Sequence, residues 1–78
     1  MPTVVQVSRS KKIIVLAGNF KQYKECCEEL NLLLRDAIYG DTVEKICSIE
    51  AGAIITTGTF LEREDAHELY SRALKCLS

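Results

Sequence analysis

The chain has 78 residues, a formal net charge of −1, 47% hydrophobic residues and 27% charged residues. These values are typical of one small globular domain, residues 1–78, and argue against disorder. The near-neutral charge gives no general attraction to nucleic acid or to anionic membranes. The longest apolar run, residues 13–17, is too short to cross a bilayer, and no signal peptide is evident. We therefore expect a cytoplasmic protein.

The cysteines are Cys26, Cys27, Cys47 and Cys76. Two are adjacent, and no C-x-x-C spacing for zinc or redox chemistry is present. Without a secretory context, we expect mostly buried, reduced thiols and no metal or other cofactor. Cys76, near the end of the last predicted helix, is expected to be the most exposed thiol and the one able to form an intermolecular disulfide.

The first half of the chain predicts two strands and a helix. Residues 3–8 alternate as in a short edge strand, and residues 12–17 are apolar enough for a strand covered on both faces. Asn19, with Gln22 three residues later, is typical of a helix N-cap. The helix is expected to reach about Leu34. Its apolar stripe is Tyr23, Cys26, Cys27, Leu30, Leu33 and Leu34.

Residues 36–50 have two interpretations. In the first, residues 36–39 form a short strand that Gly40 stops, and residues 41–46 form a helical turn. In the second, residues 43–49 form one strand. We favour the first interpretation, and residues 50–52 then predict a turn.

The last part predicts a strand at residues 53–57 and a closing helix that runs to about Leu77. Thr59 is the expected N-cap of this helix, with Glu62 in the capping-box position. Its predicted buried stripe is Ala66, Leu69, Tyr70, Ala73 and Leu74.

The two strand–Gly–x–Phe segments resemble an internal repeat. Residues 14–34 and 54–74 share five identical positions, against roughly one or two expected from average composition. The fold class is therefore α/β, with a small mainly parallel sheet of three to four strands, two principal helices and two similar βα units. Two helices cover such a sheet incompletely, so we expect a protein partner or a homodimer.

The two strand-to-helix corners are the best candidate site. Ligands of open α/β sheets bind beyond the carboxyl ends of strands, against helix N-termini. Lys21 and Lys24 suit an anion at the first corner, whereas the second carries acidic residues at 62, 64 and 65. No known nucleotide motif is present. We favour simple turns in which Phe20 and Phe60 anchor the core. The candidate ligand-binding residues are Gly18, Asn19, Lys21, Lys24, Gly58 and Thr59.

No group of residues predicts catalysis. His67 is the only histidine and is expected on the surface, and nothing builds a pocket around the paired carboxylates. The basic segment 9–12 is expected to be a loop, so nucleic acid is an unlikely partner.

The segment Gly58-Thr59-Phe60, followed by Glu62-Arg63 and Asp65-Ala66, resembles a class of small phage-encoded α/β proteins of unassigned activity. The resemblance covers about residues 12–75. The resemblance implies the fold and a viral origin. The extra strand at 3–8 is not part of this class, and we expect it to be a strand added for dimerisation. We expect a non-enzymatic interaction protein that binds a host or viral macromolecule. The alternative is a small-ligand, phosphate or nucleotide-binding domain that uses the two corners.

Overall fold

The computed structural model describes residues 3–7, 12–48 and 51–76. The sheet has the strand order β1-β4-β2-β3, in which β2, β3 and β4 are parallel and β1 is antiparallel to β4. The strands are β1 at Thr3–Val7, β2 at Ile13–Leu16, β3 at Ala37–Tyr39 and β4 at Ala53–Thr56. The predicted small, mainly parallel α/β sheet is confirmed. The predictions for residues 8–11, for Glu50 and for the helix end at Leu77 fall outside the described residues.

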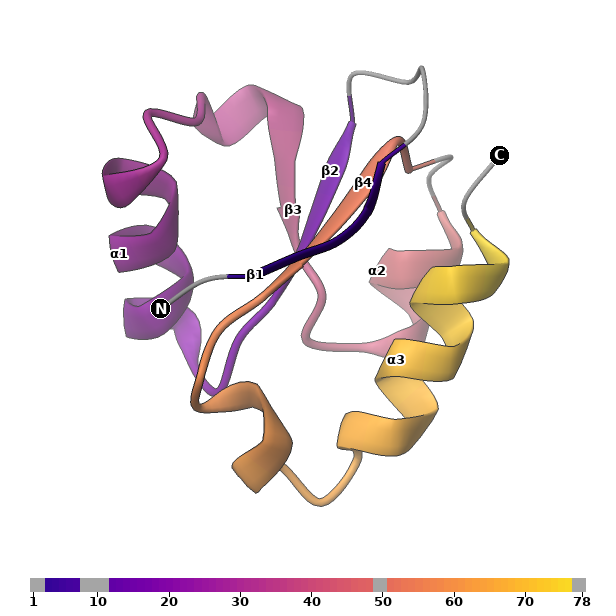
Figure 1. The fold of residues 1–78 in the computed structure, drawn as a ribbon. Coiled ribbons are helices and arrows are strands. Elements are labelled where there is room, and N and C mark those ends of the chain that lie inside the picture. Colours follow the sequence, from indigo (N-terminus) through magenta and orange to yellow (C-terminus); the bar gives the residue numbers. More distant parts are fainter. Residues whose placement is uncertain (1–2, 8–11, 49–50, 77–78) are drawn as a thin grey trace.

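Helices cover both faces of the sheet. Figure 1 shows helix α1 (Phe20–Glu29) on one side of the strands and helices α2 (Val43–Cys47) and α3 (Ala66–Lys75) on the other. Successive residues of β2 point to opposite faces, and both faces are buried, as the continuous apolar run predicts. The α1 face buries Val15, Ala17, Tyr23, Cys26, Cys27, Ala37 and Ile55. The α2–α3 face buries Ile14, Leu16, Ile46, Ala51, Ile54, Phe60, Ala66, Leu69 and Ala73.

The order of the parallel strands reverses at β2. The chain passes from β2 to β3 on one side and then returns to β4 on the other side. In open α/β sheets, the carboxyl ends of the two strands that flank such a reversal are the usual ligand site. Here those two ends are followed by the Gly18 and Gly58 corners, so the topology brings the two predicted corners together.

Helix α1 ends earlier than the predicted Leu34. Its last residue is Glu29, Leu30 is the C-cap, and Asn31 takes a φ of 54°. Asparagine tolerates this left-handed conformation, which ends the helix. Leu30 and Leu33 are 41% and 53% exposed, so the predicted buried stripe is right for the first three residues and wrong for these two leucines.

The segment after α1 follows the favoured interpretation. A 3-10 turn, η1 (Leu34–Asp36), leads into β3, and α2 follows it. Thr42 caps α2, since its hydroxyl accepts a hydrogen bond from the Lys45 amide at 3.2 Å. A single strand at 43–49 is wrong, because this local cap favours a helical turn there.

The second corner does not enter its helix directly. A 3-10 helix, η2 (Phe60–Glu62), follows Thr59, and α3 begins only after Asp65. The Thr59 side chain makes no cap hydrogen bond, so the capping-box prediction is wrong. In α3, Ala66, Leu69 and Ala73 are buried as predicted, whereas Leu74 is 38% exposed.

The two phenylalanines that follow the corners differ. Phe60 is 2% exposed and belongs to the core, as predicted. Phe20 is 57% exposed, so its prediction as a core anchor is wrong. It is the first residue of α1, and a helix that packs through Tyr23, Cys26 and Cys27 leaves this position at the edge of the contact.

All four cysteines are free thiols. Cys26 and Cys27 are buried on α1, and Cys76 is half-buried. Cys47, at the end of α2, is the exposed one. The prediction that Cys76 is the most exposed thiol is therefore wrong, because its side chain packs back onto α2, where its Sγ donates to the Ile46 carbonyl oxygen at 3.1 Å.

Candidate functional site at the carboxyl ends of the parallel strands

The two corners touch across the reversal point of the sheet. The Gly18 amide donates to Thr59 Oγ1 at 3.2 Å, and the Thr57 amide donates to the Leu16 carbonyl oxygen at 2.9 Å. A Cβ on Gly18 would lie 2.6 Å from Thr59 Oγ1, so this approach requires glycine. At the position that ligands occupy in related topologies, the chain's own threonine therefore bridges the two corners.

Thr59 explains why no capping bond forms at the second corner. Its hydroxyl lies 3.2 Å from the Thr57 hydroxyl and accepts the Gly18 amide. A hydroxyl used in this way is turned back toward β2 and is not available to the first turn of η2. The long-range contact thus replaces the local one that the sequence pattern predicts.

The Arg63 side chain lies at the same end of the sheet and forms hydrogen bonds there. Its guanidinium donates to the Ala17 carbonyl oxygen at 3.4 Å and to the Asp41 carbonyl oxygen at 3.0 Å. It also forms a two-pronged pair with Asp65, through Nε to Oδ1 at 2.9 Å and Nη2 to Oδ2 at 3.0 Å. One side chain therefore joins the segments that follow β2, β3 and β4.

The charges around Arg63 compensate one another. Asp65 pairs with Arg63, and Asp41 Oδ1 lies 3.1 Å from Lys45 Nζ. The contact between Lys45 and Asp41 is an ion pair only. Its geometry does not form a hydrogen bond, so Asp41 Oδ1 has no hydrogen-bond partner among the described residues. Two cations and two anions leave this group neutral, so it offers no excess positive charge to a phosphate.

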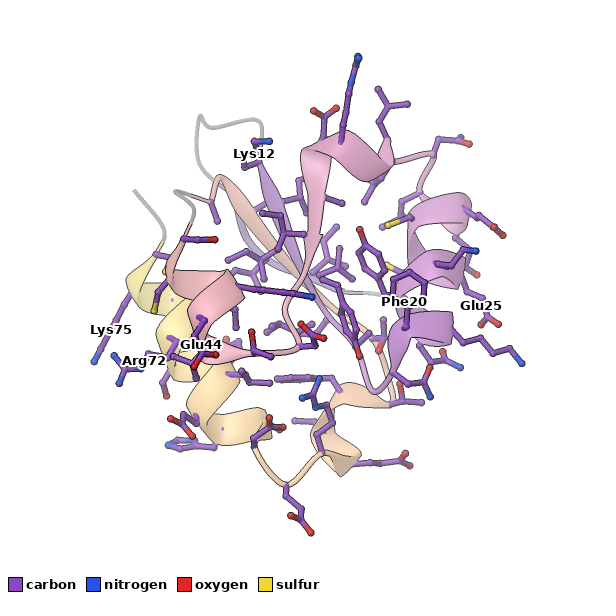
Figure 2. The ribbon with its side chains drawn as sticks, turned by 180° about the vertical axis from the view of Figure 1, so that it is seen from behind. Lys12, Phe20, Glu25, Glu44, Arg72 and Lys75 are labelled. Atoms are coloured by element: carbon purple, nitrogen blue, oxygen red, sulfur yellow. The ribbon has the colours of Figure 1, made fainter. Side chains whose placement is uncertain are left out.

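An aromatic group lies beside this polar cluster. The ring centroids of Tyr23 and Tyr39 are 5.1 Å apart and nearly parallel, and Phe20 lies 5.5 Å from Tyr23 and 5.9 Å from Tyr39. The Tyr23 hydroxyl donates to the Ala37 carbonyl oxygen at 3.3 Å. Figure 2 shows Phe20 on the inner side of α1, whereas Glu25 projects from its outer side. The exposed Phe20 ring is thus held in place by two tyrosines.

Burial controls the ionisation of both tyrosines. Burial, followed by the nearby Cys27 thiol, raises the pKa of Tyr23 to about 12. Burial also raises the pKa of Tyr39, and the Arg63 guanidinium opposes that rise. Both phenols therefore stay protonated and uncharged near neutral pH.

The first corner has the predicted helix cap, and its two lysines are exposed. Asn19 Oδ1 accepts the Gln22 amide at 2.9 Å, as the sequence predicts. Lys21 and Lys24 are exposed, and Lys24 Nζ lies 6.0 Å from the centre of the Phe20 ring. The Gly18 and Gln22 amides already donate hydrogen bonds within the chain, so neither is available to a ligand.

Two grooves flank the end of β4. One, of about 680 Å³, lies against η2 and α3, and the other, of about 430 Å³, lies against α1. Both grooves are lined by Thr57 and Gly58, and, among the described residues beyond its chain neighbours, no atom lies within 4 Å of the position of a Gly58 Cβ. The α1 groove carries three glutamates, at positions 25, 28 and 29, which disfavour an anion. The larger groove has Leu61, 83% exposed, in its lining.

The structure brings some of the predicted residues together and not others. Gly18 and Thr59 are in contact, and Asn19 and Gly58 are their chain neighbours, whereas Lys21 and Lys24 lie on the exposed surface of α1. The sequence pattern does not assign Arg63, Tyr39 or Leu61 to this end of the sheet. Arg63 stands in an acidic run, which looks like a solvated face. The one sequence signal for the place of Arg63 at the strand ends is its position two residues before an aspartate, in the segment that follows a buried strand.

The remaining candidate groups give no catalytic or metal site among the described residues. His67 is exposed, as predicted, and lines the larger groove. Among the described residues, no three His, Cys, Asp or Glu side chains are placed to hold a metal ion. No helix in the described part of the chain is long and apolar enough to cross a membrane.

Comparison of the chain with protein-family models, curated proteins and solved structures gave no match.

Proposed function

We propose that this chain is a non-enzymatic interaction protein that binds a macromolecular partner at the carboxyl edge of its parallel strands. One observation carries the proposal. The crevice at this edge is bridged by hydrogen bonds from Thr59 and Arg63, while its rim exposes the large apolar side chains of Phe20 and Leu61. A bridged crevice with an exposed apolar rim suits a broad contact with a partner better than it suits a small ligand.

The rim residues flank the crevice at one end of the sheet. Phe20 follows β2 and Leu61 follows β4, and these strands are parallel neighbours, so both residues lie at the same sheet edge. Phe20 is braced by Tyr23 and Tyr39, which lowers the conformational entropy that its ring loses on binding. A fixed aromatic ring of this kind is a common anchor of protein interfaces.

The resemblance to small phage-encoded proteins supports a host or viral macromolecule as the partner, met in the host cytoplasm. The proposal includes a homodimer. β1 ends the sheet order, so one edge of this strand faces no other strand among the described residues, and an open edge is a template for pairing with a second copy. Light scattering at tens of micromolar should give the mass of a dimer, and a monomer mass would remove this part of the proposal.

The interface is tested with two double variants, each of which replaces two exposed apolar side chains with serine. The test variant is Phe20→Ser with Leu61→Ser, and the control is Leu33→Ser with Leu74→Ser, which removes exposed apolar side chains elsewhere. Each immobilised variant captures proteins from a bacterial lysate. A species held by the wild type and the control but lost from the test variant supports the proposal. Equal capture by both variants would show that the interface lies elsewhere.

The second candidate function is phosphate or nucleotide binding at the corners. The parallel pairing of β2 with β4 favours it, because it sets the two corners side by side, with Lys21 and Lys24 on the adjoining helix. An amide NMR titration of the reduced protein with nucleotides and inorganic phosphate distinguishes the two functions. Saturable shifts at Gly18, Asn19, Gly58 and Thr59 that vanish in the double variant Lys21→Glu, Lys24→Glu would support this candidate and oppose the first.

A further inference from the structure

Two cysteines from distant parts of the chain meet at the ends of α2 and α3. Cys47 is the last residue of α2, and Cys76 is the C-cap of α3. Cys76 Sγ donates to the carbonyl oxygen of Ile46, the residue next to Cys47, at 3.1 Å. The neighbouring Cys47 side chain contributes to the raised pKa of the Cys76 thiol. In Figure 1, α2 lies beside the C-terminal half of α3.

From this meeting of side chains we infer that Cys47 and Cys76 form a thiol–disulfide site, which a low-molecular-weight disulfide oxidises to an intramolecular bridge. The bridge would join the two helices that cover one face of the sheet. The inference does not depend on the proposed interaction function.

The two thiols differ in a way that assigns their roles. Cys47 is exposed and meets a soluble disulfide first, whereas Cys76 is half-buried. Burial, and then the neighbouring Cys47 thiol, raises the pKa of Cys76, so less of it is thiolate at neutral pH. Cys47 is therefore the attacking thiol, and Cys76 is the resolving thiol.

The exchange balances in two steps with oxidised glutathione as the oxidant. The Cys47 thiolate attacks one sulfur of oxidised glutathione, forms a mixed disulfide and releases one glutathione thiolate. The Cys76 thiol then loses its proton, and its thiolate attacks Cys47 Sγ and releases the second glutathione thiolate. The protein loses two electrons and two protons, and one oxidised glutathione becomes two reduced glutathiones.

The other two thiols serve as internal controls. Cys26 and Cys27 are buried on the opposite face of the sheet, and burial is the largest cause that raises the pKa of each. As adjacent residues on one helix, their side chains point in different directions. We expect both to remain reduced under conditions that oxidise the Cys47–Cys76 pair.

The experiment incubates the folded full chain in mixtures of reduced and oxidised glutathione, followed by acid quenching and tryptic mass spectrometry. Cleavage separates the relevant thiols, because Cys47 lies in the peptide 46–63, Cys76 in 76–78, and Cys26 with Cys27 in 25–35. The expected product is a linked pair of the peptides 46–63 and 76–78. The same treatment in urea should give a mixture of pairings, since the folded geometry is then lost.

Two variants separate the steps. Cys76→Ser should accumulate glutathione on Cys47, because the resolving thiol is absent. Cys47→Ser should leave Cys76 largely unmodified at the same time point. In the wild type, the oxidised form should melt higher than the reduced form by about 10 °C. Glutathione retained on wild-type Cys47 at the level seen in Cys76→Ser, or a Cys47–Cys47 dimer, would overturn the inference.

Discussion

The two strand–Gly–x–Phe corners have similar sequences and different structures. At the first corner, Asn19 caps α1 with its own side chain, and Phe20 remains exposed. At the second corner, Thr59 turns its hydroxyl toward Gly18, the chain forms only a 3-10 turn, and Phe60 is buried. The same local pattern thus gives an exposed phenylalanine in the first copy and a buried core phenylalanine in the second.

The difference follows from where each corner lies relative to the helices. The segment after β4 must close the α2–α3 face before α3 begins, and Phe60 fills that space together with Leu69. The segment after β2 starts α1 at once, and α1 packs through residues one turn further along. A repeat in sequence therefore does not give a repeat in packing when neighbouring elements differ.

The largest predicted effect compares the two phenylalanines. Phe60→Ala should lower the free energy of unfolding by about 3–5 kcal/mol, because it leaves a cavity in the core. Phe20→Ala should cost about 1 kcal/mol or less, because its ring is mostly exposed and loses only its contacts with two tyrosines. Urea unfolding followed by circular dichroism measures both. Equal costs would mean that the two corners pack alike.

The second prediction compares the two corner glycines. Gly18→Ala should destabilise the protein by about 1–3 kcal/mol, because its Cβ would meet Thr59 Oγ1 at 2.6 Å. Gly58→Ala should be neutral or stabilising by up to about 1 kcal/mol, since its Cβ meets no atom of the described residues within 4 Å, apart from its chain neighbours, and its φ is not positive.

Thermal unfolding of the two alanine variants side by side tests the contact between the corners. Both variants replace glycine with alanine, so the effect of the substitution on the unfolded chain is the same in both and cancels when their stabilities are compared. A mild effect of Gly18→Ala would show that Thr59 moves away easily and that the crevice can open to a ligand.

The third prediction concerns the guanidinium that joins the corners. Arg63→Met keeps most of the aliphatic length but removes the hydrogen bonds to the Ala17 and Asp41 carbonyl oxygens, so it should cost about 1–2 kcal/mol. Arg72→Met, on the exposed surface of α3, is the matched control and should change stability by less than about 0.5 kcal/mol. Chemical denaturation measures both, and equal effects would mean that Arg63 does not tie the strand ends together.

The sequence predicted the strands well because their signal is local. The apolar run at residues 12–17 and the segment 53–57 can be buried on both faces only within a covered sheet, and Asn19 with Gln22 specifies a cap over three residues. The contacts that form the candidate site are not local. Thr59 reaches Gly18 across 41 residues, and Arg63 reaches Ala17 across 46. Strand order decides which segments meet there, and no residue pattern in this chain specified that order.

The smallest predicted effect concerns Tyr23, which braces the exposed ring of the first corner. Its ordinary pKa of 10.0 rises to about 12 in the folded chain, chiefly through burial. Below pH 10 the phenol is protonated in both the folded and unfolded states, so its contribution to stability is fully present. Above pH 10 the unfolded chain ionises first, and this contribution is lost as the pH rises toward 12.

Tyr23→Phe isolates this contribution. At neutral pH it should cost about 1 kcal/mol, because the Ala37 carbonyl oxygen loses its hydrogen-bond donor. Between pH 10 and 12, the free energy of unfolding of the variant should fall less steeply than that of the wild type. Tyr39, whose pKa burial also raises, should account for part of the slope that remains. Parallel slopes for the two proteins, measured by urea unfolding across this range, would show that the Tyr23 phenol reaches water and that Phe20 lacks its buried support.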